Sequence, residues 1–309
     1  MNALKFLTKF YTKLHKYNGI PFWALTPVRR VVRKVSDKLL PVYLKRTHLT
    51  SSNVASGVIV SFTSFPGRID VVWMVVETLK RQSLRPEKII LWLSKKQFPT
   101  PEDIPELLWK KEDETFSIRL VDDDIRSHKK FYYAMKEFPT KSIVTCDDDV
   151  YYHPDTIKHL VSTSKLFPGC IIANVSTEIQ WDKSGNLLPY LDWKKEYKKY
   201  ANKNRIQIGV GGVLYPPYCL KEITLQSEFF LKLAPMADDL WLGSMARLSD
   251  TRVVQSDFNY HALDIKTTAP SLGSVNNGRE KLNDKQLSDI RNFLLGEGYP
   301  DIYDVNYQT

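Results

Sequence analysis

The sequence predicts an α/β protein whose sheet is mostly parallel and covered by helices on both faces. From Gly57 onward, short apolar runs typical of buried strands alternate with helical patterns, and this alternation is the mark of βαβ units. The 309 residues have the apolar and charged fractions of a soluble globular protein and can bury a sizeable core. Ligands of such sheets bind outside the carboxyl ends of the strands. We therefore look for functional residues directly after each expected strand.

Five apolar runs are interpreted as strands, with helices between them. The runs are GVIVSF (57–62), KIILWL (88–93), SIRLVD (117–122), SIVTC (142–146) and CIIANV (170–175). A helix is expected over 69–79 because its apolar residues recur on one face. Further helices are expected near 131–138 and 153–166.

The basic character of the chain is concentrated in its first fifty residues. The formal net charge is +9, and residues 1–50 hold eleven Lys and Arg but a single acid, Asp37. Apolar residues recur there at near-helical spacing, with lysines on the other face: Leu4, Phe6, Leu7, Phe10, Tyr11 and Leu14. Such a helix can lie in the interface of an anionic membrane. Packing on the protein's own body is the alternative, and no recognised motif supports nucleic acid as a partner.

Localisation and domain organisation follow from the same segment. Lysines interrupt any secretory signal, and no uncharged apolar run approaches the length of a membrane span. Three scattered cysteines indicate a reducing compartment. We expect a cytoplasmic protein, peripheral on the inner face of the cytoplasmic membrane. The expected divisions are a basic amphipathic segment (1–50), a catalytic domain (51–270) and a helical tail (271–309).

Three consecutive carboxylates, Asp147, Asp148 and Asp149, follow the fourth expected strand. Adjacent like charges repel one another and gain nothing from burial, so a fold needs a reason to place them at a strand end. One interpretation is a site for a hard cation, in which carboxylate oxygens hold magnesium or manganese against substrate phosphates. The other is a solvated acidic turn.

Other polar residues follow the strands at the same edge. The loop after the first strand offers hydroxyls and a cation suited to phosphate, and the stretch after the third offers acids and a lysine pair. The glycines of IGVGGVLYPP allow a backbone to approach a ligand closely. These candidate substrate-binding residues are Thr63, Ser64, Arg68, Asp122, Lys129, Lys130, Gly211 and Gly212.

A second acidic pair, Asp238 and Asp239, stands where a helix should begin after Pro235. Aspartate suits a helix N-cap, which is the structural interpretation. The functional interpretation makes one carboxylate a general base that activates a hydroxyl nucleophile. His261 is a candidate metal ligand, although lone histidines are more often structural.

Taken in order, these motifs resemble a known family. The chain resembles bacterial glycosyltransferases of the GT-A fold, family-2-like enzymes of capsule, lipopolysaccharide and other surface-polysaccharide synthesis. The resemblance spans roughly residues 57–265 and rests on VIVSFTSFPGRI, KIILWLS, HKKFYYAMKEF, VTCDDDVYY, GVGGVLYPP and APMADDLWL. The Gln-x-x-Arg-Trp motif of processive synthases is missing, so a non-processive enzyme is expected.

The resemblance implies roles for these residues. It makes Asp147 to Asp149 the DxD motif, with Asp149 on Mn²⁺ or Mg²⁺ and Asp147 or Asp148 nearer the ribose or sugar. It places the nucleotide near Thr63, Ser64 and Arg68, with Lys129 or Lys130 assisting, and Trp241 beside the substrate. Asp239, or its neighbour Asp238, matches the acid that activates the acceptor. An inverting mechanism is the expectation from the family alone.

The expected activity is metal-dependent transfer of a sugar from a nucleotide-sugar donor to a glycan or lipid-linked acceptor. WDKSGNLLPYLDWKKEYKKY (181–200), with its aromatic and basic residues, is a candidate acceptor surface. Two alternatives remain open. A metal-dependent nucleotidyltransferase would use the same acids but needs a stronger glycine-rich phosphate loop than TSFPGR. A non-catalytic glycan- or membrane-binding protein would hold calcium with the same acids.

Overall fold

One eight-stranded sheet organises the chain. The structure, a computed structural model, describes residues 2–16, 21–47, 51–194, 200–258, 261–269, 276 and 281–307. Across the sheet the strands follow the order β3 (Phe116–Val121), β2 (Arg85–Ser94), β1 (Val54–Thr63), β4 (Ser142–Thr145), β9 (Val213–Tyr215), β5 (Ile171–Ala173), β10 (Val253–Gln255) and β7 (Ala201–Asn202). A small second sheet pairs β6 (Ser176–Glu178) with β8 (Arg205–Gln207).

Most strands of the large sheet run in one direction. β1 is parallel to β2 and β4, β2 to β3, and β5 to β10, whereas β9 is antiparallel to both β4 and β5. β1, β2 and β4 contain buried β-branched and aromatic residues, as expected of strands covered on both faces. The prediction of an α/β fold with a mostly parallel sheet is confirmed.

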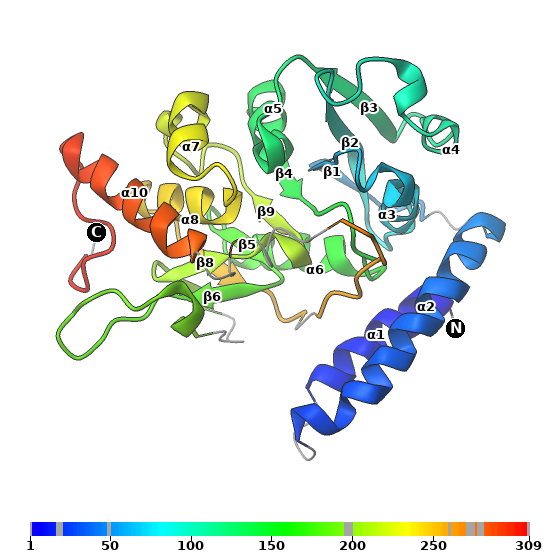
Figure 1. Ribbon diagram of the computed structural model, residues 1–309, viewed down its shortest axis with the longest axis horizontal. Helices are drawn as coiled ribbons and strands as arrows, with labels where there is room; N and C mark the ends of the chain where they lie inside the picture. The colour runs from blue at the N-terminus through cyan, green and yellow to red at the C-terminus, as the bar shows by residue number, and fades with distance from the viewer. Residues whose placement is uncertain are drawn as a thin grey trace.

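Helices surround the sheet (Figure 1). They are α1 (Ala3–His15), α2 (Thr26–Arg46), α3 (Val72–Lys80), α4 (Glu106–Trp109), α5 (Lys129–Glu137), α6 (Thr156–Leu166), α7 (Ser227–Leu233), α8 (Asp238–Leu248) and α10 (Leu282–Gly296). α7, α8 and α10 lie together on one side of the molecule, and α1 and α2 form a long hairpin on the other (Figure 1).

The expected strands all form within a few residues of their predicted limits, and so do the helices near 69–79, 131–138 and 153–166. The position of β9 was not anticipated. It inserts antiparallel between β4 and β5, and its register places Val213 opposite Thr145. Pairing between segments so distant in the chain leaves no local pattern to read.

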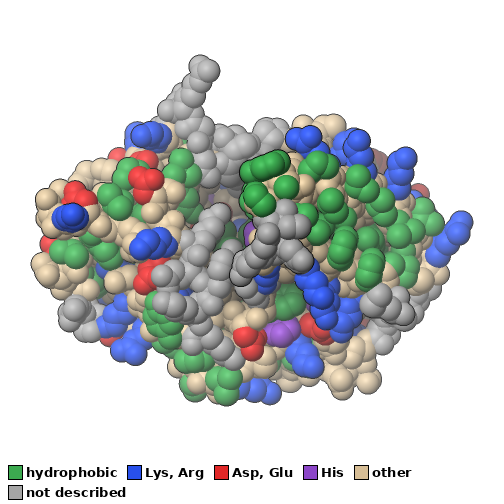
Figure 2. Space-filling view, turned by 90° about the horizontal axis from the view of Figure 1, so that it is seen from below, with side chains coloured by type: hydrophobic (Ala, Val, Ile, Leu, Met, Phe, Trp, Pro, Cys, Tyr) green, Lys and Arg blue, Asp and Glu red, His purple; other side chains and the backbone are tan. Residues whose placement is uncertain are grey.

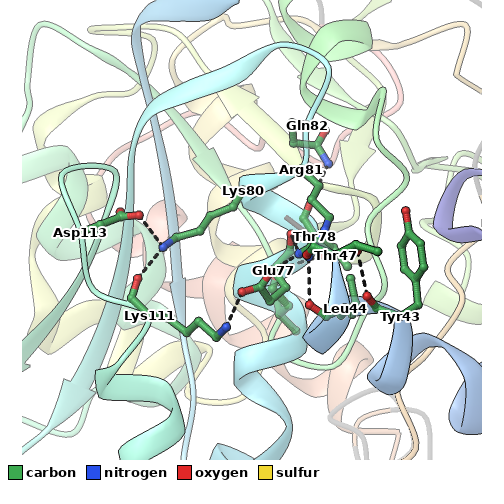
Figure 3. Close-up of polar contacts among 11 residues, drawn as sticks. Tyr43, Leu44, Thr47, Glu77, Thr78, Lys80, Arg81, Gln82, Lys111 and Asp113 are labelled. Carbon is green, nitrogen blue, oxygen red and sulfur yellow. Dashed lines mark hydrogen bonds and ion pairs between the residues drawn. The ribbon is translucent and has the colours of Figure 1, made fainter. Parts of the chain in front are cut away.

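The N-terminal hairpin is attached to the body of the protein through buried contacts. Leu40 and Leu44 of α2, and Leu4 of α1, belong to the same hydrophobic core as the central strands. At the end of α2, the buried guanidinium of Arg81 donates hydrogen bonds to the carbonyls of Leu44, at 2.9 Å, and Thr47 (Figure 3). A helix end leaves carbonyls without partners, so these bonds stabilise the end of α2 against α3.

A buried ion network holds Arg81 in place (Figure 3). Its guanidinium pairs with Glu77 one helical turn earlier, and Lys111 pairs with the other oxygen of Glu77 at 2.7 Å. Nearby, Lys80 pairs with Asp113 at 2.8 Å. The hairpin is therefore joined to α3 and to the loop after α4.

The face of α1 differs from the prediction. The sequence pattern assigned Leu4, Phe6, Leu7, Phe10 and Tyr11 to a single apolar face. In the structure Leu4, Leu7 and Tyr11 are buried, whereas Phe6 and Phe10 are exposed. The expected face is thus divided, because α2 and the body cover only part of it.

Candidate active site

Two acidic motifs meet at the carboxyl edge of the sheet. Asp147 to Asp149 follow the end of β4. Because β9 is antiparallel, its first residue lies beside the last residue of β4, and the short 3-10 helix η6 (Gly209–Gly211) that precedes it lies at the same edge. The edge is the place where ligands bind in sheets of this kind.

The middle acid of the triplet, Asp148, is held inside the protein. One of its carboxylate oxygens accepts a hydrogen bond from the Ser64 hydroxyl at 2.6 Å, and the other pairs with Arg68 at 2.8 Å. Only 6% of Asp148 is exposed. Burial raises its pKa, although Arg68 and Ser64 act in the opposite direction. Ser64 and Arg68 therefore anchor the triplet, in a role different from the phosphate contact expected of them.

Asp149 shares the same guanidinium. Its carboxylate lies 2.9 Å from the Arg68 nitrogen that also binds Asp148. Burial, followed by repulsion from Asp147, raises the pKa of Asp149 to about 7. Arg68 alone thus compensates the charge of Asp149 incompletely, which is the electrostatic condition in which an added cation is favourable.

Lys130 joins the two acidic motifs. Its ammonium lies 2.9 Å from a carboxylate oxygen of Asp147 and 2.9 Å from one of Asp238. Burial opposes the charge of Lys130, but these two carboxylates outweigh burial and hold its pKa well above the usual value. Residues separated by more than ninety positions in the chain are therefore fixed at one point.

Gly209 occupies the centre of this cluster. Its backbone N–H donates to Asp239 Oδ2 at 3.0 Å. A Cβ at this position would lie 3.1 Å from the Lys130 ammonium, 3.2 Å from Asp239 Oδ1 and 3.4 Å from Asp147 Oδ1. A side chain here would be in tight contact with the Lys130 ammonium and Asp239, which would have to shift by a few tenths of an ångström.

The acids of the second motif are not equivalent. Although burial acts against it, Lys130 lowers the pKa of Asp238, which remains ionised. Burial, and then repulsion from Asp238, raises the pKa of Asp239 to about 7. Two neighbouring carboxyl groups with pKa values displaced in opposite directions are the usual arrangement for acid–base work.

Helix capping does not explain this pair. Asp238 and Asp239 are the first two residues of α8, and the N-cap is Ala237, with no side-chain capping bond. Both carboxylates benefit from the positive end of the helix dipole. Their side chains are nevertheless directed to Lys130 and to the Gly209 backbone.

A further acid, Asp264, lies beside the triplet. Val150 pairs with Asp264 in an isolated bridge, and the Ile265 N–H donates to the Asp149 carbonyl at 2.7 Å. Burial raises the pKa of Asp264. The Arg33 guanidinium of α2, 3.4 Å from the Asp264 carboxylate, opposes this rise. No local sequence signal marks Asp264, because its position depends on this bridge to a distant loop.

Several residues expected at the site lie elsewhere. The side chain of Trp241 is fully buried in the core, where its indole N–H donates to the Thr224 carbonyl at 3.0 Å, so it has no face to offer a substrate. Asp122 is on the surface, paired with Lys95 at 2.7 Å. The ring of His261 stacks on that of His15 of α1, with ring centres 4.2 Å apart.

Other expected residues are committed to the fold. The Thr63 hydroxyl donates to the Trp92 carbonyl at 2.8 Å, and the buried Lys129 pairs with Asp124 at 2.5 Å. Gly211 allows close packing, since a Cβ there would lie 2.8 Å from Val175 Cγ2. Gly212 has a φ of +85°, a conformation that favours glycine.

The candidate acceptor surface is described only in part. Trp193 is 5% exposed, and its indole donates to the Leu188 carbonyl at 2.9 Å. The Trp181 indole donates to the Tyr303 carbonyl at 2.9 Å. Residues 195–199, which carry most of the lysines of this segment, lie outside the described residues.

The triplet offers two partly exposed carboxylates, Asp147 and Asp149, as possible metal ligands. Asp147 and Asp149 each have one carboxylate oxygen engaged by a cation, Lys130 and Arg68 respectively, and both side chains are partly exposed. Throughout the described ranges, no three His, Cys, Asp or Glu side chains are grouped to hold a metal. Magnesium typically takes one or two carboxylates and completes its shell with phosphate oxygens and water, so the donor set fits that ion.

Comparison with known proteins identifies the type of domain. Residues 58–200 match the model of the glycosyl transferase family 64 domain. The chain is a glycosyltransferase. The matching model is that of family 64, not a family-2-like one. The matched residues include the Asp147–Asp149 triplet, Ser64, Arg68 and Lys130, while Asp238 and Asp239 follow the matched region. No curated protein sequence matches the chain.

Three solved structures are similar to the chain at low sequence identity. Glucosyl-3-phosphoglycerate synthase from Mycobacterium tuberculosis, in complex with Mg²⁺ and UDP, is 10% identical, with a TM-score of 0.42 over 81% of this chain and 80% of that one. HddC from Yersinia pseudotuberculosis is 14% identical, with a TM-score of 0.33 over 54% and 77%. CMP:2-keto-3-deoxy-manno-octonic acid synthetase with CTP is 8% identical, with a TM-score of 0.41 over 75% and 99%.

Proposed function

We propose that the chain transfers a sugar from a nucleotide-diphosphate donor to a hydroxyl of a glycan or lipid-linked acceptor. The observation that carries this proposal is the junction at Lys130, which holds the triplet acid Asp147 and the α8 acid Asp238 to one ammonium. Sugar transfer needs a site for the leaving diphosphate and a carboxylate near the acceptor hydroxyl. In this proposal the triplet serves the diphosphate and the α8 acids serve the acceptor hydroxyl, within one cluster.

A divalent cation, Mn²⁺ or Mg²⁺, is proposed to bind Asp149 and Asp147. When bound, it would neutralise charge that grows on the leaving diphosphate. The raised pKa of Asp149 supports this role, because it marks a carboxylate whose charge is incompletely compensated. Asp148 is assigned to positioning, since Ser64 and Arg68 occupy its oxygens.

Asp239 is proposed as the base that removes the acceptor proton. A base works best when its pKa is near the working pH, and burial beside Asp238 raises that of Asp239 to about 7. The Gly209 N–H orients the carboxylate. As a base, Asp239 would support an inverting displacement. In a retaining reaction it would only orient the acceptor, so the configuration of the product distinguishes the two roles.

The decisive experiment measures nucleotide release from a panel of nucleotide sugars, with Mn²⁺ or Mg²⁺ and candidate acceptors. Wild type should release nucleoside diphosphate, whereas Asp149→Ala and Asp239→Asn should lose at least about a hundredfold in kcat. Asp122→Asn is the matched control, because Asp122 is an exposed acid paired with Lys95, and it should retain full activity. Full activity of Asp149→Ala would refute the proposed site.

The same assay separates the alternative of a nucleotidyltransferase. That enzyme would release pyrophosphate from a nucleoside triphosphate and a sugar phosphate, and would release no nucleoside diphosphate from a nucleotide sugar. Arg68, the cation of the loop after β1, is bound to Asp148 and Asp149. These ion pairs favour the sugar-transfer reaction, because an Arg68 that binds two carboxylates is less able to bind the phosphates that a nucleotidyltransferase would hold in the TSFPGR loop.

The biological setting is proposed to be bacterial surface-polysaccharide or lipopolysaccharide synthesis at the cytoplasmic face of a membrane. The basic N-terminal segment supports a peripheral location. None of the described helices is both long and apolar enough to cross a bilayer. A lipid-linked acceptor would meet the enzyme at that surface.

A further inference from the structure

The outer side of the N-terminal hairpin carries exposed apolar side chains. On α2, Val28, Val31, Val35, Leu39 and Val42 are each between 40% and 58% exposed. Their spacing of three, four, four and three residues places them on one side of the helix, along roughly 21 Å of its length. We call these five residues the α2 stripe.

The exposure of the α2 stripe is not a result of an unpacked helix. Val32, Ser36, Leu40 and Leu44, on another face of α2, are buried. The helix therefore has two apolar faces, one of which packs on the protein while the other is open. Water-exposed apolar stripes of this length are uncommon on soluble proteins and mark interaction surfaces.

The turn of the hairpin presents two aromatic rings. Phe22 is 64% exposed and Trp23 is 75% exposed, both in the 3-10 helix η1 (Phe22–Leu25). Arg29 fixes this turn. Its guanidinium donates to the Phe22 carbonyl at 2.6 Å and to the Leu14 carbonyl at 3.2 Å, and it lies 3.7 Å from the centre of the Phe22 ring. Exposed aromatics on a fixed turn suit the boundary between lipid headgroups and acyl chains.

Cations accompany the apolar residues. Residues 1–50 contain eleven Lys and Arg and a single acid. Nine of these cations are exposed, and six of the nine are on α2: Arg30, Arg33, Lys34, Lys38, Lys45 and Arg46. Figure 2 shows hydrophobic side chains gathered over the side of the molecule that holds the hairpin, with Lys and Arg at the edges of that patch.

We propose that the α2 stripe and the Phe22–Trp23 turn dock on the surface of an anionic lipid bilayer. A bilayer satisfies both features, because the apolar residues enter the interface while each neighbouring cation gains about 1 kcal/mol near anionic headgroups. A second copy of the chain would bring two strongly basic segments together, which is unfavourable. A nucleic acid would pair with the cations but leave the stripe in water.

This inference deepens the membrane location proposed above and is independent of the sugar-transfer chemistry. It moves the membrane-facing surface from the apolar face predicted on α1, which is partly buried, to the outer side of α2. It also relates that surface to the site. Arg33 of α2 pairs with Asp264 beside the triplet, and the Thr12 hydroxyl of α1 lies 3.3 Å from the His261 carbonyl. Docking would hold the catalytic edge in a fixed relation to the membrane.

The test is flotation of the full-length protein with vesicles of phosphatidylcholine, alone or mixed with phosphatidylglycerol. Wild type should bind the mixed vesicles and release as salt is raised. Val31→Asp/Val35→Asp should lower the bound fraction at least about tenfold, and Trp23→Ser should lower it in part. Leu166→Asp is the matched control, since Leu166 is 65% exposed at the last residue of α6, outside the α2 stripe and η1, and it should bind as wild type does.

Three results would overturn the inference. Wild type could fail to bind either vesicle, Leu166→Asp could lose binding equally, or light scattering could reveal a dimer that Val31→Asp/Val35→Asp dissociates. An unchanged melting temperature of the stripe variant confirms that it is folded. Nucleotide release with a water-soluble acceptor is measured alongside, so that a failure of docking is distinguished from a failure of the proposed chemistry.

Discussion

Lys130 is the residue on which the site depends most. Its ammonium is buried between Asp147 and Asp238, and the backbone carbonyl of Lys130 accepts the Ser61 hydroxyl at 2.5 Å. Removing one partner of a buried ion pair leaves an uncompensated charge, which costs more than the pair itself contributes. Lys130→Met should therefore lower the free energy of unfolding by about 3 to 5 kcal/mol and abolish transfer.

The second variant that completes this prediction is Lys130→Met/Asp238→Asn. Removing the charge of Asp238 as well should recover part of the lost stability but none of the activity. Urea unfolding of Lys130→Met, Asp238→Asn, the double variant and wild type measures the first effect, and nucleotide release measures the second. If the double variant is as unstable as the sum of the single variants, Lys130 and Asp238 do not interact as described.

His128 makes stability depend on pH. Its Nε2 lies 2.9 Å from the Ala234 carbonyl and donates a hydrogen bond to it, so the neutral ring carries no proton on Nδ1. A protonated ring would carry a second N–H at Nδ1, for which no acceptor lies within hydrogen-bonding distance among the described residues. Burial lowers the pKa of His128 to about 4. The unfolded chain then binds more protons between pH 6.5 and 4, so stability present above pH 6.5 is lost as the pH falls through this range.

The expected contribution is at most about 3 kcal/mol, lost between pH 6.5 and 4. His128→Gln keeps a donor for the Ala234 carbonyl but cannot titrate. Unfolding by urea at a series of pH values should show a slope reduced by about one proton for this variant. An identical slope for wild type and variant would show that His128 does not control acid stability.

Some residues of the candidate site could be predicted from the sequence, whereas the contacts of others could not. The triplet and Lys130 were singled out because they follow expected strands at the edge of the sheet where ligands bind. The partners of Arg68 and the burial of Trp241 were not foreseen, since a guanidinium suits carboxylate and phosphate equally. A tryptophan next to an acidic pair gives no sign of which side of the helix it occupies.

At the scale of elements, η6 provides a test of the proposed site. A Cβ on Gly209 would meet Lys130, Asp239 and Asp147, whereas a Cβ on Gly211 would meet Val175 and Asn174 of the core. Gly209→Ala should thus reduce kcat strongly. Gly211→Ala should instead lower stability, by about 1 to 3 kcal/mol from overpacking.

Gly296→Ala is the control for both glycine variants. A Cβ there meets nothing within 4 Å, and Gly296 ends α10, so the substitution should leave activity unchanged and add up to about 1 kcal/mol of stability. The comparison requires kcat and thermal unfolding for all three variants. Equal effects of Gly209→Ala and Gly211→Ala on both quantities would contradict the separate roles.

The elements themselves were largely predictable. β1, β2 and β4 contain continuous apolar runs, and such runs indicate strands buried on both faces wherever they pair. The position of β9 and the bridge of Asp264 to Val150 depend on pairings across the chain. For that reason the acids were found from the sequence, while the contacts that assemble them required the structure.

At the scale of the whole molecule, the question is whether the hairpin is part of the folding unit. The sequence suggested a separate basic segment over residues 1–50. In the structure Leu40 is fully buried in the core that includes the central strands, whereas its neighbour Leu39 is 47% exposed on the α2 stripe. Substitutions of these two adjacent leucines therefore test separately the buried face and the exposed face of α2.

Leu40→Ala should lower the free energy of unfolding by about 2 to 5 kcal/mol, because it leaves a cavity between the hairpin and the body. Leu39→Ala should change it by less than about 0.5 kcal/mol. Both variants should unfold in one transition, followed by circular dichroism and by intrinsic fluorescence. An independent appendage would behave differently, since Leu40→Ala would then leave the main transition in place. Leu39→Ala should instead weaken vesicle binding, so the same pair of substitutions separates folding from docking.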